Sequence, residues 1–357
     1  MSTKNSSVRW LYLVLGTASL LFGGIIYAWS ILKAPLTAEF GWSDSSLSLN
    51  FTLTMCFFCI GGMAGGALLK KIGFKLSCII SAVLSAAGFI LAGGMSGGIA
   101  MLYISYGLLA GLGIGMAYNC IISTVSAWFA DKKGLCSGVL MMGFGASALI
   151  LGSLADALIS NESFGWRMVF YMLGAALGVM FLITAVILRA PKPGEAPAPK
   201  PAAGASSARD YTTGEMLRSI TFWKAFILVV FLAAVGNTVI SMARDLALSV
   251  GAVESLATLL VGVLSVCNGL GRVITGAVFD RFGRKTTMLG ANIVAIFAAG
   301  LTLLAVFTSS TALCVVGLCL TGISYGSCPT ISSAFISEVF GSKYFAMNFP
   351  LSLIHIS

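Results

Sequence analysis

Charged residues are rare in this chain, and they divide it into eight long apolar runs. Six of the runs are 19 to 25 residues long, close to the roughly 20 residues that a helix needs to cross a bilayer. The other two exceed 50 residues and contain a polar break, at residues 93–98 and 308–311, so each predicts two spans. The runs cover residues 10–32, 45–69, 76–130, 134–155, 168–188, 225–243, 255–279 and 286–337. This pattern predicts ten complete membrane-spanning helices and the start of an eleventh near Tyr344.

The pattern and the composition exclude several protein classes. Strands of a membrane barrel would be about 10 residues long and alternate in polarity, and these runs have neither property. Hydrophobic residues make up 58% of the chain and charged residues 9%, whereas a soluble domain usually carries about 25% charged residues. We therefore expect an all-α protein embedded in a lipid bilayer, and not a soluble enzyme, a nucleic-acid-binding domain or a disulfide-stabilised secreted domain.

The distribution of basic residues predicts the orientation in the membrane. If the N-terminus is cytoplasmic, the cytoplasmic segments hold 17 of the 21 Lys and Arg residues and the outer segments hold 3. An excess on the cytoplasmic side is the usual signature of membrane topology. The net charge of +9 therefore indicates orientation, and we expect no nucleic-acid partner. We expect a multi-pass protein of the plasma (inner) membrane.

Residues 190–221 differ from the rest of the chain. Five of the eight prolines lie there among Ala, Gly and Ser, a composition typical of a solvated, extended linker. We expect this linker to be cytoplasmic. It separates an N-terminal six-helix bundle, residues 1–189, from an incomplete C-terminal bundle, residues 222–357.

The two sides of the linker carry related segments. Residues 66–75 (GALLKKIGFK) follow the second span, and residues 276–285 (GAVFDRFGRK) follow the eighth, 210 residues later. Parallel repeats with a substrate site between them near the middle of the membrane are a known design of secondary transporters. The second copy matches the loop motif G-x-x-x-D-R-x-G-R-[KR] of the major facilitator superfamily at every defined position, while the first copy has Lys70 in place of the acid.

The chain thus resembles the major facilitator superfamily over nearly its whole length. Within that superfamily it is similar to the oxalate/formate antiporter family of carboxylate transporters. The features that carry this resemblance are Tyr27-Ala28-Trp29-Ser30, Trp128-Phe129 before Lys132-Lys133-Gly134, and the lone Arg272. The resemblance implies two six-helix bundles and a monomer without a cofactor, which moves oxalate, formate, pyruvate or a similar carboxylate by alternating access.

The C-terminus departs from the family pattern. The superfamily fold has twelve spans, and this chain stops inside the eleventh, with an unusual tail at residues 351–357. We therefore expect a C-terminally truncated sequence. In the family, span 11 can supply a second cationic substrate ligand, which is left unassigned here.

Arg272 is the strongest candidate for a substrate ligand. It lies five residues from the centre of the run 255–279, or about 7 Å at 1.5 Å per residue. Burying a guanidinium at such a depth costs roughly 2.5–3.5 kcal/mol. Ser265, Asn268 and Thr275 share its helical face, which favours a polar cavity and a carboxylate ligand. The alternative is that the side chain snorkels to the cytoplasmic headgroups.

Tyr27, Tyr118 and Tyr325 lie inside spans 1, 4 and 10, which line the cavity in the superfamily. Their hydroxyls can hold a carboxylate oxygen while the rings enclose a short carbon backbone. The alternative is packing in the bilayer or an interfacial belt. We assign Tyr27, Tyr118, Tyr325 and Asn268 to the substrate site together with Arg272.

The loop motif suggests a mechanical role. Gly276 and Gly283 permit close helix approach and a tight turn. Asp280 can form an ionic latch between the bundles with the basic residues Arg281, Arg284 and Lys285. The alternative is an anchor that obeys the positive-inside rule, and the two roles are compatible. Lys70 predicts a weaker latch in the first half.

The sequence argues against several other activities. No Asp or Glu lies deep in a span, which favours exchange or facilitated movement of an anion over a proton relay. A drug or sugar carrier would have an embedded acid or many amides, and a membrane enzyme or receptor would have catalytic clusters or a sensor domain. We expect no enzyme activity, no metal site and no cofactor.

The topology leads to a test at the linker. Because basic residues flank it on both sides, a cysteine introduced by Ser206→Cys should react with a membrane-impermeant maleimide only from the cytoplasmic side of oriented vesicles. Labelling from the outer side would overturn the orientation.

Overall fold

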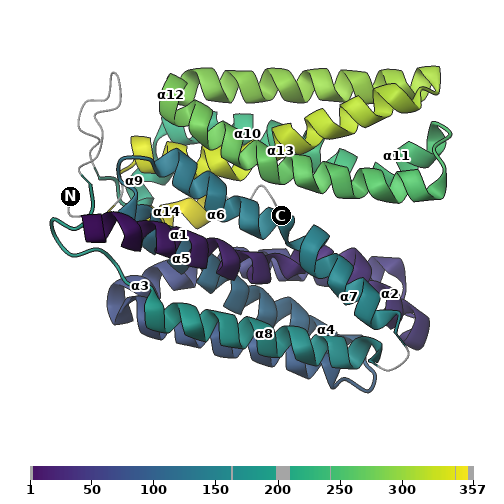
Figure 1. Ribbon diagram of the computed structural model, residues 1–357, viewed down its shortest axis with the longest axis horizontal. Coiled ribbons are helices and arrows are strands. Elements are labelled where there is room, and N and C mark those ends of the chain that lie inside the picture. Colours follow the sequence, from purple (N-terminus) through teal and green to yellow (C-terminus); the bar gives the residue numbers. More distant parts are fainter. Residues whose placement is uncertain (1–2, 162–163, 198–209, 242, 342, 353–357) are drawn as a thin grey trace.

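The computed structural model describes residues 3–161, 164–197, 210–241, 243–341 and 343–352. The middle of the expected linker, residues 198–209, and the tail 353–357 lie outside the described residues. Figure 1 shows two groups of helices side by side, α1–α8 and α10–α13, with the short helices α9 and α14 near the end that holds the N-terminus. We call α1–α8 the N-terminal bundle, α10–α14 the C-terminal bundle, and the end that holds the N-terminus and α9 the linker end.

The N-terminal bundle contains the first six spans, several of which join segments of different helix type. Spans 1, 4 and 5 contain a short 3₁₀ or π-helical segment between α-helices. The segments are α1 (Thr3–Gly23), the 3₁₀ segment η1 (Gly24–Ala28), α2 (Trp29–Phe40), α3 (Asp44–Gly93), α4 (Ile99–Leu102), the π-helical η2 (Tyr103–Ala110), α5 (Gly111–Trp128), α6 (Lys133–Ser147), the π-helical η3 (Ala148–Gly152), α7 (Ser153–Ile159) and α8 (Gly165–Ile187).

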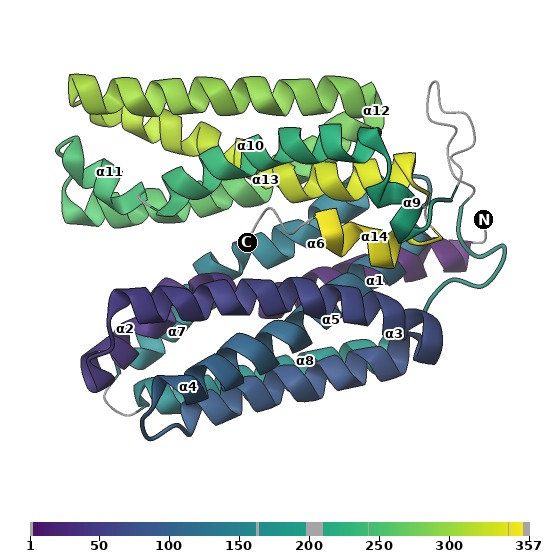
Figure 2. The ribbon, with the colours of Figure 1, turned by 180° about the vertical axis from the view of Figure 1, so that it is seen from behind.

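The C-terminal bundle begins after the linker. The short α9 (Thr213–Leu217) starts with a capping box, in which Thr212 and Glu215 satisfy each other's backbone amides. The remaining segments are α10 (Ile220–Ser241), α11 (Ala243–Ser249), α12 (Glu254–Thr308), α13 (Thr311–Val339) and α14 (Phe345–Ser352). Figure 2 shows α14 and α6 between the two main groups of helices.

Eight helices of the described chain are long and apolar enough to cross a membrane. Two of them, in α3 and α12, are 50 residues long, which is far more than the roughly 20 residues that span a bilayer. Each therefore holds two spans joined by a bend. The helices account for the ten complete spans expected from the sequence, and α14 lies where the eleventh was expected to begin.

Both bends are made by the same device. Gly73 in α3 has φ 79° and Gly283 in α12 has φ 75°, a backbone conformation that residues with a Cβ rarely adopt. After each glycine, a hydroxyl four residues on donates to its carbonyl, Ser77 Oγ to Gly73 O and Thr287 Oγ1 to Gly283 O, both at 2.8 Å. The two halves of the chain thus share the motif and its local structure.

Glycine at the bend leads to a prediction about stability. An alanine at position 283 would meet no atom within 4 Å, so Gly283→Ala introduces only the backbone strain of a residue with a Cβ at φ 75° and ψ 175°, about 1–3 kcal/mol. We expect it to lower the free energy of unfolding in detergent by that amount. Gly290→Ala, in the same helix, also meets nothing within 4 Å but has a helical backbone, and it should be neutral or slightly stabilising. Equal thermal unfolding curves for the two variants would contradict this account of the bend.

Candidate functional site

Arg272 is buried between the two bundles. Its side chain is only 2% exposed, and its Nε donates to Asn268 Oδ1 of the same helix at 3.2 Å. Its Nη1 donates to the backbone carbonyl of Met141 in α6, across the bundle boundary, at 2.7 Å. The guanidinium therefore faces the N-terminal bundle, an arrangement that differs from a side chain that snorkels to a headgroup.

The three tyrosines named from the sequence converge on this guanidinium. Tyr27 of η1 interacts with the Arg272 side chain, and Tyr118 of α5 and Tyr325 of α13 lie near enough to interact with its charge. Tyr118 and Tyr325 are buried inside the protein. The fold therefore brings Arg272, Asn268 and the tyrosines together from four different segments.

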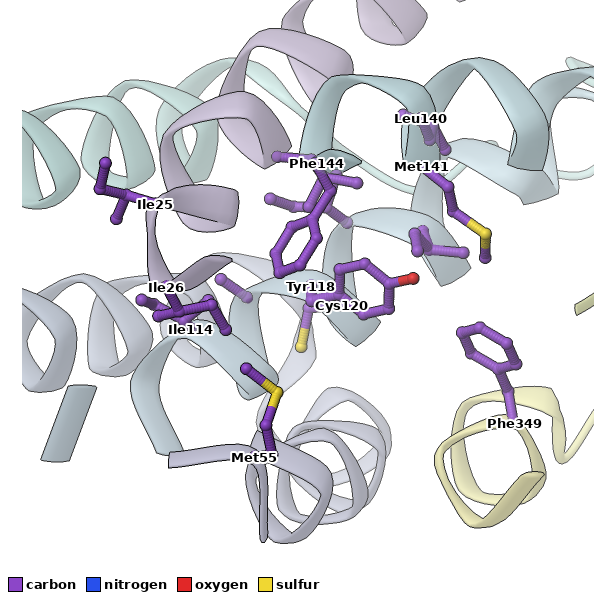
Figure 3. Close-up of a cluster of buried hydrophobic side chains, with 14 of the residues drawn as sticks. Ile25, Ile26, Met55, Ile114, Tyr118, Cys120, Leu140, Met141, Phe144 and Phe349 are labelled. Carbon is purple, nitrogen blue, oxygen red and sulfur yellow. The ribbon is translucent and has the colours of Figure 1, made fainter. Parts of the chain in front are cut away.

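An aromatic cluster that the sequence did not single out surrounds the tyrosines. Phe144 of α6 lies edge-on to Tyr118 and Tyr27, with ring centroids 4.9 and 5.3 Å apart. Phe58 of α3 lies 5.1 Å from Tyr118, and Phe349 of α14 stacks on the same tyrosine at 6.3 Å. Figure 3 shows Tyr118, Phe144 and Phe349 together with Met141. These rings form apolar walls beside a cationic group.

A small cavity borders this cluster on the side of α3 and α14. Its lining is mainly apolar, with one amide, one phenol and one thiol, and consists of Phe58, Cys59, Gly62, Tyr118, Asn119, Phe349 and Pro350. The internal repeat could have revealed part of it, because Phe58 and Gly62 lie 210 residues before Asn268 and Arg272. The cavity therefore occupies the place in the first half that corresponds to the Arg272 position in the second.

The loop motif contacts the other bundle through its acid. Asp280 accepts hydrogen bonds from the backbone amides of Gly134 and Leu135, at 3.1 and 2.9 Å. These amides belong to the first turn of α6, where amide groups lack helical partners and the helix dipole favours a negative charge. Asp280 thus caps a helix of the opposite bundle.

The basic residues of the loop motif make contacts of their own. Arg284 approaches Glu338 of its own bundle at 3.9 Å, and Arg281 lies over the ring of its neighbour Phe282. Lys285 is exposed. Gly276 allows the approach itself, since a Cβ there would collide with the backbone carbonyl of Gly134.

The first copy of the motif makes a different contact. Lys70 lies over the ring of Tyr344, with its Nζ 4.2 Å from the ring centroid. Gly66 packs closely on the backbone of Ala346. At this position the first copy has a cation–π contact, worth about 0.5–1 kcal/mol at an exposed site, where the second copy has a charged cap.

The contacts between α6 and the C-terminal bundle gather toward the linker end. They include the Asp280 cap, a hydrogen bond of 2.9 Å between the hydroxyls of Ser137 and Ser333, and the bond from Arg272 to Met141. All three lie within α6 (Lys133–Ser147), the half of span 5 nearer to the linker end. The structure therefore has the bundles joined at the linker end.

Comparison with known proteins gives a consistent picture. The family model described as Major Facilitator Superfamily matches residues 9–349. The "Oxalate:formate antiporter" of Oxalobacter formigenes is 29% identical over 351 residues, which covers 96% of this chain and 80% of that protein. The "Uncharacterized MFS-type transporter YhjX" of Escherichia coli (strain K12) is 27% identical over 349 residues, covering 96% and 83%.

Solved structures show a similar fold. The proton:xylose symporter XylE bound to 6-bromo-6-deoxy-D-glucose has a TM-score of 0.76 at 17% identity, covering 99% of this chain and 87% of that one. A variant of the E. coli fucose:proton symporter FucP has a TM-score of 0.64 at 14% identity, covering 98% and 90%. At these identities the likeness concerns the fold alone.

The cap made by Asp280 leads to a prediction about conformation. Asp280→Asn keeps an acceptor oxygen but removes the charge, and hydrogen bonds to charged groups contribute about 1 kcal/mol more than neutral ones. We therefore expect the linker end to open more often. Cys136, which is buried next to this contact, should react with a maleimide about fivefold faster in a background in which every other cysteine is replaced.

A matched variant controls for the loss of an acid. Asp156 is exposed on α7, far from the linker end, and Asp156→Asn should leave the labelling rate of Cys136 at the wild-type value. Equal rates for the two variants would show that the Asp280 carboxylate does not hold the bundles together.

Proposed function

Because the chain belongs to the Major Facilitator Superfamily, we propose that this membrane protein carries small organic anions by alternating access, with oxalate, formate, pyruvate or a similar short carboxylate as substrate. The observation that carries this proposal is the buried guanidinium of Arg272. A cation that is 2% exposed at this depth is costly, and a carboxylate bound there would offset that cost.

The surroundings of Arg272 suit a small carboxylate. Nε and Nη1 of Arg272 donate to Asn268 and Met141, and the planar fork of N–H groups that a guanidinium presents matches two carboxylate oxygens. The phenol of Tyr118 supplies a further polar group beside the fork. The rings of Phe58, Phe144 and Tyr118 restrict the space, which favours a substrate with a short carbon backbone.

The balance of charges supports the same class of substrate. The sequence has no Asp or Glu deep in a span, so a bound anion would meet no fixed negative charge in the membrane interior. A cationic drug would lack a counter-charge at this site. An embedded carboxylate that could relay protons is equally absent from the sequence, which favours exchange or facilitated transport.

The name of one relative supports the proposed class of substrate, whereas the structural neighbours support the fold alone. The printed name of one of them is an oxalate:formate antiporter, at 29% identity. The structural neighbours are sugar:proton symporters by their titles, at 14–17% identity. We propose the plasma membrane as the site of action, with the N-terminus and linker cytoplasmic and the carrier monomeric.

The proposal is tested by uptake into proteoliposomes across a panel of short carboxylates and one sugar. Arg272→Lys keeps the charge but loses the fork, so substrate affinity should fall. Arg272→Gln also removes the charge and should lower affinity roughly ten- to a hundredfold, which corresponds to about 1.5–3 kcal/mol for hydrogen bonds to a charged group.

The control is Arg218→Gln, which removes an exposed cation after α9 and should transport like the wild type. Wild-type carboxylate kinetics in a well-expressed Arg272→Gln variant would remove Arg272 from the site. Uptake of the sugar but of no carboxylate would instead favour a carrier of another solute class.

A further inference from the structure

The side chain of Arg272 in the C-terminal bundle is hydrogen-bonded to the backbone of the N-terminal bundle. Arg272 Nη1 donates to Met141 O at 2.7 Å, and both groups are buried. A carbonyl has two lone pairs, so Met141 O can accept this bond and still accept the helical bond from position 145. Met141 O thus accepts a hydrogen bond from a guanidinium N–H group that could instead donate to an oxygen of a bound carboxylate.

Gly145 makes this bond possible. A Cβ at position 145 would lie 3.1 Å from Arg272 Cζ, 3.2 Å from Nε and 3.3 Å from Nη2. Side chains on a helix tilt toward its N-terminus, so a residue at position 145 would cover the carbonyl one turn before it, which is that of Met141. The absence of a side chain at Gly145 leaves room for the guanidinium and exposes the carbonyl.

The bond has a direct consequence for movement of the bundles. Opening at the linker end has to move α6 away from α12, where Gly134 packs on Gly276 and Gly138 on the backbone of Arg272. This movement breaks the bond from Arg272 to Met141. A guanidinium N–H left without an acceptor in the protein interior is costly, so an empty carrier resists opening.

A bound carboxylate lowers the free-energy cost of opening at the linker end. Its oxygens accept from the same fork of N–H groups, so the guanidinium no longer depends on Met141 O when the bundles separate. A ligand shifts a conformational equilibrium by its differential affinity for the two states, and here the difference comes from the replaced acceptor. Reorientation becomes easier with substrate bound than without it.

We propose that Met141 O, exposed by Gly145, acts as a stand-in for the substrate carboxylate in the empty carrier and thereby makes the protein an exchanger. Gly145 is on this view a positioning residue, which acts through Arg272. The inference rests on the proposed carboxylate transport and adds the reason why an empty carrier does not return by itself.

Two substitutions at one position test the bond. Gly145→Ala places a methyl group against the guanidinium and displaces it by a few tenths of an ångström. Gly145→Ser does the same and adds a hydroxyl, which bonds to the carbonyl four residues earlier, the acceptor that Arg272 uses. Both variants weaken the bond from Arg272 to Met141, and serine does so more.

The measurement compares two rates in the same proteoliposomes loaded with radiolabelled oxalate or formate. One is exchange against external carboxylate, and the other is net efflux into medium without substrate. We expect the ratio of net efflux to exchange to rise in Gly145→Ala and to rise further in Gly145→Ser, on the order of tenfold. Gly269→Ala serves as the matched control. It adds a methyl to the same interface but meets only Met142 Cγ at 3.4 Å, so its ratio should equal the wild-type value.

A second readout does not require transport. Without substrate, Cys136 at the linker end should react faster with a maleimide in Gly145→Ser than in the wild type or in Gly269→Ala. The labelling rate of Cys136 can be measured on any variant that inserts into the membrane. A Gly145 variant that does not transport therefore still tests the bond from Arg272 to Met141.

The outcomes separate the two proposals. If the wild type moves none of the carboxylates, the proposed function fails. If the wild type exchanges carboxylates but the ratio and the labelling of both Gly145 variants equal those of Gly269→Ala, the bond to Met141 does not hold the empty carrier and this inference is overturned. Net efflux as fast as exchange in the wild type would also overturn it.

Discussion

The candidate site depends on the cation Arg272, which is buried between the two helical bundles and, in the part of the chain that the structure describes, donates hydrogen bonds to neutral oxygens and to no carboxylate. A guanidinium in the membrane interior has to find acceptors, and the chain supplies the amide oxygen of Asn268 and the backbone oxygen of Met141, with the phenol of Tyr27 nearby. Neutral acceptors stabilise the cation without cancelling its charge. The site therefore keeps a net attraction for an anion while the protein remains folded.

Backbone groups and glycines carry the contact between the bundles. Asp280 binds amides of α6, and Arg272 binds a carbonyl of the same helix. Such close approach is possible because Gly134, Gly138 and Gly276 bring the two backbones nearly into contact. Hydrogen bonds to backbone groups hold a defined geometry, and each contributes about 1.5–3 kcal/mol when one partner is charged. An interface of a few such bonds can open and close reversibly.

The two halves of the chain have similar backbone structure, but different residues occupy the matching positions. The bends at Gly73 and Gly283 are the same down to the hydroxyl that follows each of them. In the repeat, however, Lys70 occupies the position equivalent to Asp280, and Gly62 occupies the position equivalent to Arg272. The first half thus supplies most of the aromatic rings and most of the lining of the small cavity, and the second half supplies the charge together with Phe349 and Pro350. An asymmetric site between symmetric bundles can hold an anion that has a charged end and an apolar body.

The sequence by itself determined the spans, the bends and the candidate residues of the substrate site. Hydrophobic length and the cost of charge in a bilayer are local properties, so the ten spans and the exceptional Arg272 could be recognised along the chain. The helical period placed Asn268 on the same helical face as Arg272. The repeated loop motif indicated a tight turn at Gly283. The convergence of Tyr27, Tyr118 and Tyr325 on Arg272 came from the family resemblance, since their spans are far apart in sequence.

Only the tertiary structure decided what these groups touch. Met141 lies 131 residues from Arg272, and it takes part through a carbonyl that every residue possesses, so no side-chain pattern could identify it. The same holds for the amides of Gly134 and Leu135, which bind Asp280. Sequence patterns report the burial and charge of side chains, whereas the partners of a buried charge depend on which backbone the packed bundles bring within about 3 Å.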